Sequence, residues 1–477
     1  MKQNFGSWNA TRRVGLLLFS FYAAEGAGLL SALAWYKNGA RPFLLLLTGR
    51  YSPFFLGGTL TFLASSVYLF SRYRRAQRDN RREFWFTLAL NVVVVGALLI
   101  FGEATVRLFQ SRIFFATTFM NTVLLPRSWG ESIARNRALL ERAPSNISYF
   151  IPDDLLGWTI GANRRSTDGL YSSSAEGIRS ARAGESYAAR TRAYRIALVG
   201  DSFTFGLEVP FEESWGHRLE QEFESRIQVL NFGVDGYGVD QAYLRYWRDV
   251  RPWKPDLVIF GFINHDLYRS MAVYAFVSFP EWGFPFAKPR FAVDRGKLHM
   301  VNAPVLSPEA ILAHRSIFDL PFIEYDRGYN PHEWEWRPYH RSYLVRFLLS
   351  RYPRWPEQRS DVVSDEAVKV VNSEILTSFA KLAKAEGSTP LIVYLPSRIG
   401  FQDGGTEAKD SVLRMLRARG IEYEDLTSCL RRFSVSELFI EGRPHYSPKG
   451  NAMVARCLSP IVRRHLNRRS SQKVDPS

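Results

Sequence analysis

A regular alternation of apolar runs and helical patterns constrains the second half of the chain most. Arg195–Val199, Gln228–Phe232 and Asp256–Phe262 are short, nearly continuous apolar runs, and the alternation resumes later with runs at 390–396 and 421–424. Strands that alternate with helices form βαβ units, and continuous apolar runs are typical of strands buried on both faces. The sequence therefore predicts an α/β fold built on a parallel sheet.

The helices of this alternation are predicted from periodicity and from capping residues. Ser364 is followed by two acidic residues and an apolar stripe that ends before Gly387, and Pro448 follows Ser447 as the first residue of the last helix. We expect helices at 213–226, 240–250, 364–387, 407–419 and from Pro448 onward.

Residues 270–362 interrupt the alternation and form an aromatic-rich insertion. Within it the stretch "RFAVDRGKLHMV" predicts a β-hairpin. Its aromatic side chains could stack on sugars, but we favour the interpretation that they form the core of a small cap. The residues concerned include Trp282, Trp334, Trp336 and Tyr339.

Three apolar stretches stand near the N-terminus, at about 14–35, 54–70 and 84–101. A helix of about 20 residues crosses the ~30 Å bilayer core, so the sequence predicts a bundle of about three transmembrane helices, the alternative being buried helices of a soluble domain. The segment 71–83 contains six Arg, which places it and the N-terminus in the cytoplasm. The chain after about residue 105 is then outside the cytoplasm.

These patterns divide the chain into four parts. Residues 1–110 form the transmembrane region, and residues 111–193 form a stalk followed by a turn-rich segment. Residues 194–465 form the α/β domain with the insertion at about 270–362, and residues 466–477 form a basic tail that we expect to be disordered.

The positive charge is concentrated in the N-terminal part. The formal net charge is +16, and residues 1–83 hold twelve Lys or Arg against three Asp or Glu, so the remaining 394 residues carry only +7. This distribution and the lack of a zinc-finger spacing argue against nucleic acid as a partner, and the expected contact is the lipid bilayer. Cys429 and Cys457 allow a disulfide or two unpaired thiols, and neither suggests a metal site.

Four candidate site residues lie where the alternation predicts the end of a strand or the start of a helix. Ser202, Gly236 and Asn264 follow the first three strands, and His445 precedes the last helix. In open α/β sheets the binding crevice lies at the carboxyl edge. A hydroxyl nucleophile needs a base such as imidazole, and a tetrahedral oxyanion needs N–H donors. Taken one by one, the same residues are ordinary caps and turn residues.

In this order, Gly200-Asp201-Ser202, Gly236, Asn264 and His445 resemble the sequence blocks of the SGNH or GDSL hydrolase family. The resemblance covers about residues 148–465 and implies a flavodoxin-like, three-layer domain. It implies Ser202 as nucleophile and His445 as its base, with Ser202, Gly236 and Asn264 as the oxyanion hole. His265 is a rival base that lacks the family position. The stretches "DDLLGW", "EGIRS" and "GDSFTFG" resemble a membrane-anchored bacterial branch.

One departure from the family pattern concerns the acid of the triad. The family usually has an Asp two or three residues before the histidine, where this chain has Arg443 and Gly442. Glu441 is a candidate substitute if the loop bends, and a main-chain carbonyl is another. Otherwise the site is a Ser-His dyad, takes its carboxylate from elsewhere, or has lost hydrolysis.

The resemblance implies a serine esterase held in the plasma or inner membrane as a multi-pass protein, with its catalytic domain outside the cytoplasm. The expected reaction removes acyl groups, acetyl in particular, from a cell-surface polysaccharide or lipid. This chemistry requires no cofactor and no metal. The alternatives are an acyltransferase that needs a protein partner, and a catalytically impaired envelope protein that binds glycan or serves as a scaffold.

Overall fold

The computed structural model describes residues 81–474, except 114–115, 121, 143–147, 225, 281–282, 352–360 and 403–406. The chain divides into two compact units. The first contains residues up to 131 together with 331–359, and the second contains 132–330 together with 360–477. The predicted spans at 14–35 and 54–70 lie outside the described residues.

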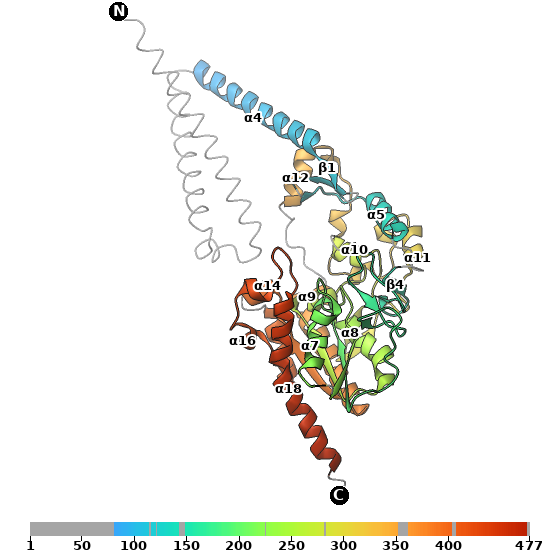
Figure 1. Cartoon of the computed structure of the whole chain (residues 1–477). Coiled ribbons are helices and arrows are strands. Elements are labelled where there is room, and N and C mark those ends of the chain that lie inside the picture. The colour runs from blue at the N-terminus through green and yellow to red at the C-terminus, as the bar shows by residue number, and fades with distance from the viewer. Residues whose placement is uncertain are drawn as a thin grey trace, which may run out of the picture. The chain divides into compact units, whose positions relative to one another are not determined.

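A seven-stranded sheet forms the centre of the second unit (Figure 1), in the order β14-β13-β10-β8-β9-β7-β6. The strands from β14 to β9 are mutually parallel and are arranged 2-1-3-4-5 in chain order, while β7 and β6 are antiparallel additions. The predicted α/β fold with a parallel sheet is thus confirmed. The parallel strands are β8 (Tyr194–Val199), β9 (Ile227–Asn231), β10 (Leu257–Phe262), β13 (Thr389–Tyr394) and β14 (Tyr423–Asp425).

Helices cover both faces of this sheet, and alternate residues of each strand pack against opposite layers. In β8, Ala197 and Val199 pack on one side with the helices α8, α13 and α15, whereas Ile196 and Leu198 pack on the other with α7 and α18. The apolar runs are continuous because both faces are buried. The helices are α7 (Trp215–Gln221), α8 (Val239–Arg245), α13 (Asp365–Ala385), α15 (Glu407–Ala418) and α18 (Pro448–Val474).

The helix caps and the hairpin that the sequence predicts are present in the structure. The Ser364 Oγ accepts a hydrogen bond from the Ala367 N–H at 3.1 Å and so caps α13. The Ser447 Oγ accepts from the Gly450 N–H at 2.9 Å at the start of α18. The predicted hairpin is confirmed as the antiparallel pair β11 (Phe291–Asp294) and β12 (Lys297–Met300).

The described residues of 111–193, a range predicted as a stalk and a turn-rich segment, contain seven short strands. In the first unit β1 (Ser111–Ile113), β2 (Ala116–Phe119) and β3 (Thr122–Val123) form an antiparallel sheet. In the second unit β4 (Phe150–Asp153) pairs with β5 (Gly157–Ile160), and β6 (Ser172–Ser173) and β7 (Arg179–Ser180) extend the central sheet. Strands of two to four residues are too short to show a period of two in the sequence.

The aromatic-rich insertion at about 270–362 is divided between the two units. Residues 331–359 belong to the first unit, where Trp334 packs against Trp129 with ring centroids 6.4 Å apart, and residues 270–330 belong to the second. Trp336 and Tyr339 are exposed, and Trp282 lies outside the described residues. The helices of this region are α10 (Ala275–Ser278), α11 (Pro308–Ala313) and α12 (Tyr343–Arg351).

The first unit also contains the long helix α4 (Arg81–Phe109), which includes the third predicted span. Several of its large apolar side chains are exposed, namely Phe86, Val93, Leu98, Leu99, Ile100, Phe101, Leu108 and Phe109. Glu103 of α4 accepts hydrogen bonds from the N–H groups of Tyr343 and Leu344, at 3.0 and 2.8 Å, and so caps α12. Over the part of the chain that the structure describes, no helix combines the length and apolar composition required to cross a membrane.

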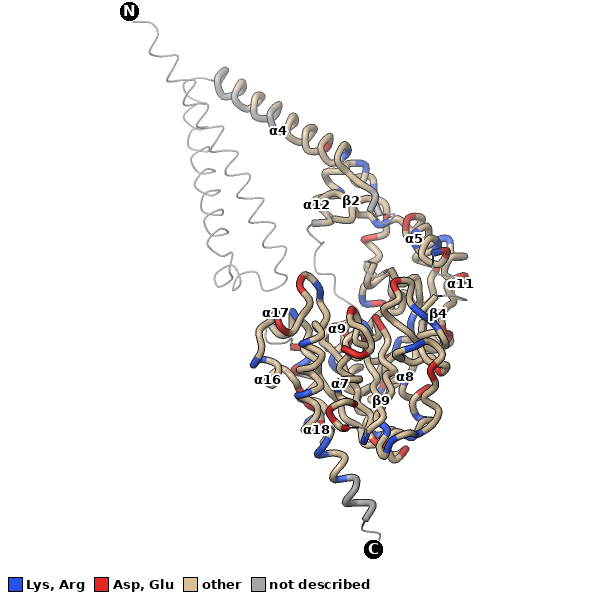
Figure 2. Tube along the Cα trace, viewed as in Figure 1, with Lys and Arg blue, Asp and Glu red and all other residues tan. Residues whose placement is uncertain are grey.

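The C-terminal part differs from prediction in one respect and answers one question that the sequence left open. Helix α18 continues through residues 466–474, where we expected disorder, because it extends without a break from the helix packed on α7. The question left open by the two cysteines is answered by a disulfide between Cys429 and Cys457, which joins α16 (Thr427–Leu430) to α18. Figure 2 shows basic and acidic residues interspersed along the described chain.

Candidate active site

The turn after β8 fixes the position of Ser202. A Cβ on Gly200 would lie 2.2 Å from the Thr204 Oγ1 and 2.4 Å from the Gly261 carbonyl oxygen, so only glycine fits there. The Asp201 Oδ1 then accepts the Phe203 N–H at 3.0 Å and caps the short helix α6 (Ser202–Phe205). Ser202 is therefore held as the first residue of a helix at the carboxyl end of a central strand.

His445 faces Ser202 from the loop that precedes α18. The His445 Nε2 lies 3.0 Å from the Ser202 Oγ. The loop closes on itself through the Ile440 N–H, which donates to the His445 carbonyl oxygen at 3.1 Å, and through the Tyr446 hydroxyl, which donates to the Pro396 carbonyl at 2.7 Å. These bonds orient the imidazole toward the serine hydroxyl. The structure thus brings together two residues, 243 positions apart, that the sequence selected.

The other ring nitrogen of His445 contacts Glu208, a residue that the sequence analysis missed. The His445 Nδ1 lies 3.0 Å from the Glu208 Oε2. A carboxylate only accepts, so Nδ1 carries the proton and Nε2 is free to accept from the serine hydroxyl. The chain reaches this position because Gly206 ends α6 with φ +77°, and the Glu208 N–H donates to the Tyr171 hydroxyl at 2.9 Å.

The prediction for Glu441 is wrong in its geometry. Both ring nitrogens of His445 already have partners, and Glu441 is exposed. Arg443, at the position where the family has an aspartate, donates from its Nη1 to the Glu208 Oε1 at 3.3 Å. Glu208 escaped detection because the family pattern places the acid near the histidine. Its one signal in the sequence is its place on the loop that leaves the nucleophile turn.

Gly236 and Asn264 follow the two strands that flank β8. Gly236 comes after β9 with φ +79°, and a Cβ there would lie 2.9 Å from the Phe284 ring and 3.2 Å from the Trp158 ring. Asn264 is buried and begins α9 (Asn264–Arg269) directly after β10. In the described part of the chain, no backbone carbonyl accepts the N–H of Ser202 or Gly236. The predicted donors thus come from adjacent strand ends at one edge of the sheet.

The remaining candidates are separate from this arrangement. His265, the rival base, is exposed, and the hydroxyl of Ser202 pairs with His445 instead. Burial raises the pKa of the Asp235 carboxyl beside Gly236, while the positive charge of Arg269 opposes this effect. Among the described residues, no cluster of three His, Cys, Asp or Glu side chains could hold a metal ion.

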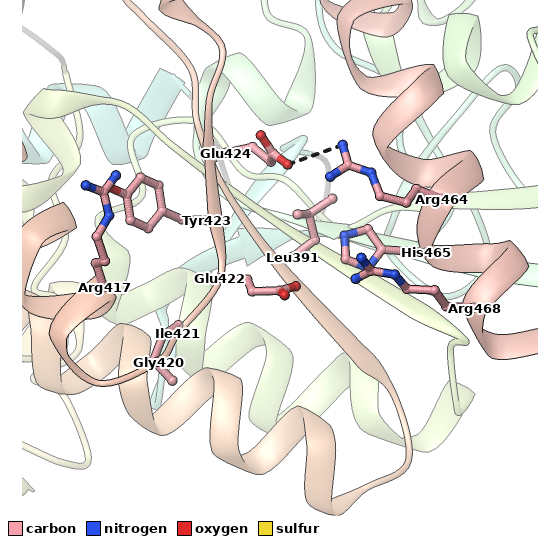
Figure 3. Close-up of a pocket in the computed structure, with 10 residues that line it drawn as sticks. All are labelled: Leu391, Arg417, Gly420, Ile421, Glu422, Tyr423, Glu424, Arg464, His465 and Arg468. Atoms are coloured by element: carbon pink, nitrogen blue, oxygen red, sulfur yellow. Dashed lines mark hydrogen bonds and ion pairs between the residues drawn. The ribbon is translucent and has the colours of Figure 1, made fainter. Parts of the chain in front are cut away.

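A cavity of about 410 Å³ lies elsewhere, between β14 and α18 (Figure 3). Its polar lining includes Arg417, Glu422, Glu424 and Arg464, and the Arg464 guanidinium pairs with the Glu424 carboxylate at 3.8 Å. None of the residues selected from the sequence lines it. The hydrogen-bonded residues Ser202, Glu208 and His445 are therefore separate from this cavity.

Comparison with known proteins gave matches among solved structures only. No family model matches the chain, and no curated protein matches it. A lipolytic protein of the G-D-S-L family from Desulfitobacterium hafniense is 15% identical and covers 56% of this chain and 99% of its own, with a TM-score of 0.30. An acetylxylan esterase from Geobacillus stearothermophilus is 14% identical over 56% of this chain and 93% of its own, with a TM-score of 0.30.

A lipase/acylhydrolase from Enterococcus faecalis is 12% identical over 56% of this chain and 95% of its own, with a TM-score of 0.31. This chain has Gly200-Asp201-Ser202-Phe203 at the GDSL position, so phenylalanine replaces the leucine. The Phe203 ring lies 5.1 Å from the His445 ring, measured between centroids.

Proposed function

We propose that this chain is a serine esterase of the SGNH type, anchored in the plasma or inner membrane with its catalytic domain outside the cytoplasm. Its substrate is an acyl ester, acetyl in particular, on a cell-surface polysaccharide or lipid. The observation that carries the proposal is the continuous hydrogen-bonded series Ser202–His445–Glu208. A nucleophile, a base and an acid that orients the base are the parts that acyl transfer requires.

The geometry supports a two-step reaction. The Ser202 Oγ attacks the ester carbonyl while its proton passes to the His445 Nε2, and Glu208 stabilises the imidazolium that forms. The N–H groups of Ser202 and Gly236 and the Asn264 amide stabilise the oxyanion. The alcohol leaves with the proton from His445. A water molecule, deprotonated by His445, then attacks the acyl-enzyme, releases the acid and restores Ser202.

The location outside the cytoplasm is supported by two independent features. The three apolar stretches and the Arg-rich segment 71–83 predict an N-terminal membrane region with this orientation. The disulfide between Cys429 and Cys457 is typical of an oxidising compartment. In spheroplasts, added protease should remove a tag fused to the C-terminus of the membrane-bound full chain. A tag that is protected until the membrane is lysed would contradict this orientation.

Turnover of p-nitrophenyl acetate by the detergent-solubilised full chain tests the reaction. We expect turnover in the wild type and a loss of at least about 10³-fold in Ser202→Ala, because the acyl-enzyme cannot form. A fluorophosphonate should label the wild type and not the variant. Equal turnover in both folded proteins would contradict the proposal. Release of acetate from an acetylated glycan, compared with release from a lipid ester of matched acyl length, then identifies the substrate class.

A further inference from the structure

Arg269 is a buried residue at the end of α9, and it lies behind the site rather than in it. Its Nη1 lies 2.8 Å from the Asp266 Oδ1, 3.2 Å from the Asp201 Oδ2 and 3.5 Å from the Tyr237 carbonyl oxygen. Both carboxylates are 1% exposed. A single guanidinium therefore contacts three segments that are far apart in the sequence.

Each contacted residue adjoins one donor of the proposed oxyanion hole. Asp201 precedes Ser202, Tyr237 follows Gly236, and Asp266 comes two residues after Asn264. These three segments leave the ends of the adjacent strands β8, β9 and β10. Arg269 thus connects the three segments whose relative positions set the spacing of the three donors.

Each of the two carboxylates also accepts a hydrogen bond from a backbone N–H group. The second oxygen of Asp201 accepts the Phe203 N–H at 3.0 Å, and the second oxygen of Asp266 accepts the Ile263 N–H at 2.9 Å. The loop after Gly236 is tied to the same helix by close packing, because a Cβ on Gly238 would lie 2.7 Å from the Ser270 nitrogen. A shift of the guanidinium would therefore move the peptide groups beside the donors.

The charges explain why this position needs a cation. Burial raises the pKa of Asp201 and of Asp266, the negative charge of Asp201 raises that of Asp266 further, and Arg269 lowers both. Without Arg269, two buried carboxyls would either repel each other or take up protons. Both outcomes remove the attraction that holds the strand ends together.

We propose that Arg269 is a positioning residue that sets the spacing of the oxyanion donors. It contacts no substrate and acts through Asp201, Tyr237 and Asp266. The inference rests on the proposed function for its catalytic consequence. The expected effect of Arg269 on the binding of a tetrahedral anion at Ser202 can be measured whether or not the chain turns over an ester.

The test measures the affinity of the full chain in detergent for phenylboronic acid, which forms a tetrahedral anion on a serine oxygen. We expect Arg269→Met to weaken this binding about 10²-fold, the scale of losing one oxyanion donor. Where p-nitrophenyl acetate is turned over, kcat should fall by a similar factor while KM changes less than about threefold. Arg269→Lys should recover part of the loss because it restores the charge.

Arg245→Met is the matched control. Arg245 is also buried and pairs with Asp249 at 2.6 Å, but it contacts Thr159 and Gly177 rather than the donor segments. This control should lower the melting temperature and leave boronate affinity unchanged. Equal boronate affinity in wild type and Arg269→Met would overturn the inference. Arg269-dependent binding of boronate at Ser202 without any ester turnover would support the inference while contradicting the proposed function.

Discussion

At the residue scale, Glu208 contacts the His445 Nδ1 at 3.0 Å, and the proposed function assigns it the role of the triad acid. Its backbone has φ +69°, a conformation that residues other than glycine rarely adopt, and it is kept there by the turn at Gly206 and the bond to Tyr171. Arg443, at the position of the family aspartate, pairs with the outer oxygen of Glu208. That pair is exposed on the arginine side, so it contributes little to stability.

Replacing Glu208 by glutamine removes the carboxylate that contacts the His445 Nδ1. Glu208→Gln should lower kcat by about 10²-fold or more, because an amide cannot stabilise the imidazolium, and loss of the corresponding acid costs about 10⁴-fold in serine proteases. Glu441→Gln is the control and should stay within about twofold of wild type. Ester hydrolysis kinetics of both variants decide the matter. Loss of activity in Glu441→Gln with a normal Glu208→Gln would show that Glu441 is the acid in solution.

At the scale of elements, α9 contains a buried carboxyl, Asp266, whose pKa is raised although it pairs with Arg269. Burial raises the pKa of Asp266 above the usual 3.8, and the charge of the neighbouring Asp201 adds to this effect against the opposing Arg269. A raised pKa in the folded state gives stability at low pH that is lost as pH rises through the folded-state pKa. Other titratable groups that interact with this cluster include the Asp235 carboxyl, the imidazoles of His265 and His445, and the hydroxyls of Tyr394 and Tyr446.

Asp266→Asn removes this titration and keeps an oxygen that can accept the Ile263 N–H. As pH rises from about 4 toward neutrality, the melting temperature of the wild type should therefore fall relative to that of the variant. Thermal unfolding of the two full-length proteins at several pH values measures the difference. A difference that does not change with pH would mean that Asp266 titrates at its ordinary value in the folded chain.

The elements also show what the sequence could and could not predict. The five parallel strands and their helices were found because burial on both faces leaves a strong apolar signal, as in β8 and β10. Ser202 and His445 were found because they lie at strand and helix ends in a family order. Glu208 and Arg269 were not, because their roles depend on a tertiary contact, and the two-residue strands β6 and β7 are too short to carry a period.

At the scale of the whole chain, the disulfide between Cys429 and Cys457 closes a loop of 28 residues. In the chain-entropy model such a loop stabilises the folded state by about 3.6 kcal/mol. Reduction should therefore lower the melting temperature by roughly 5 to 10 °C. The Cys429→Ser, Cys457→Ser double variant should melt at the lower temperature with or without reductant. An unchanged melting temperature on reduction would show that the bridge is absent or without effect.

The long separation of the triad along the chain has a consequence for biosynthesis. Ser202 and Glu208 come from one short turn, but His445 is made 243 residues after Ser202. At typical rates of synthesis the ribosome needs roughly 12 to 50 seconds to cover that distance. Ser202 is thus without its imidazole partner until synthesis has passed His445 and the loop before α18 has packed against the turn after β8. Under the proposed function, a chain that stops before His445 therefore has Ser202 without its base and should not turn over esters.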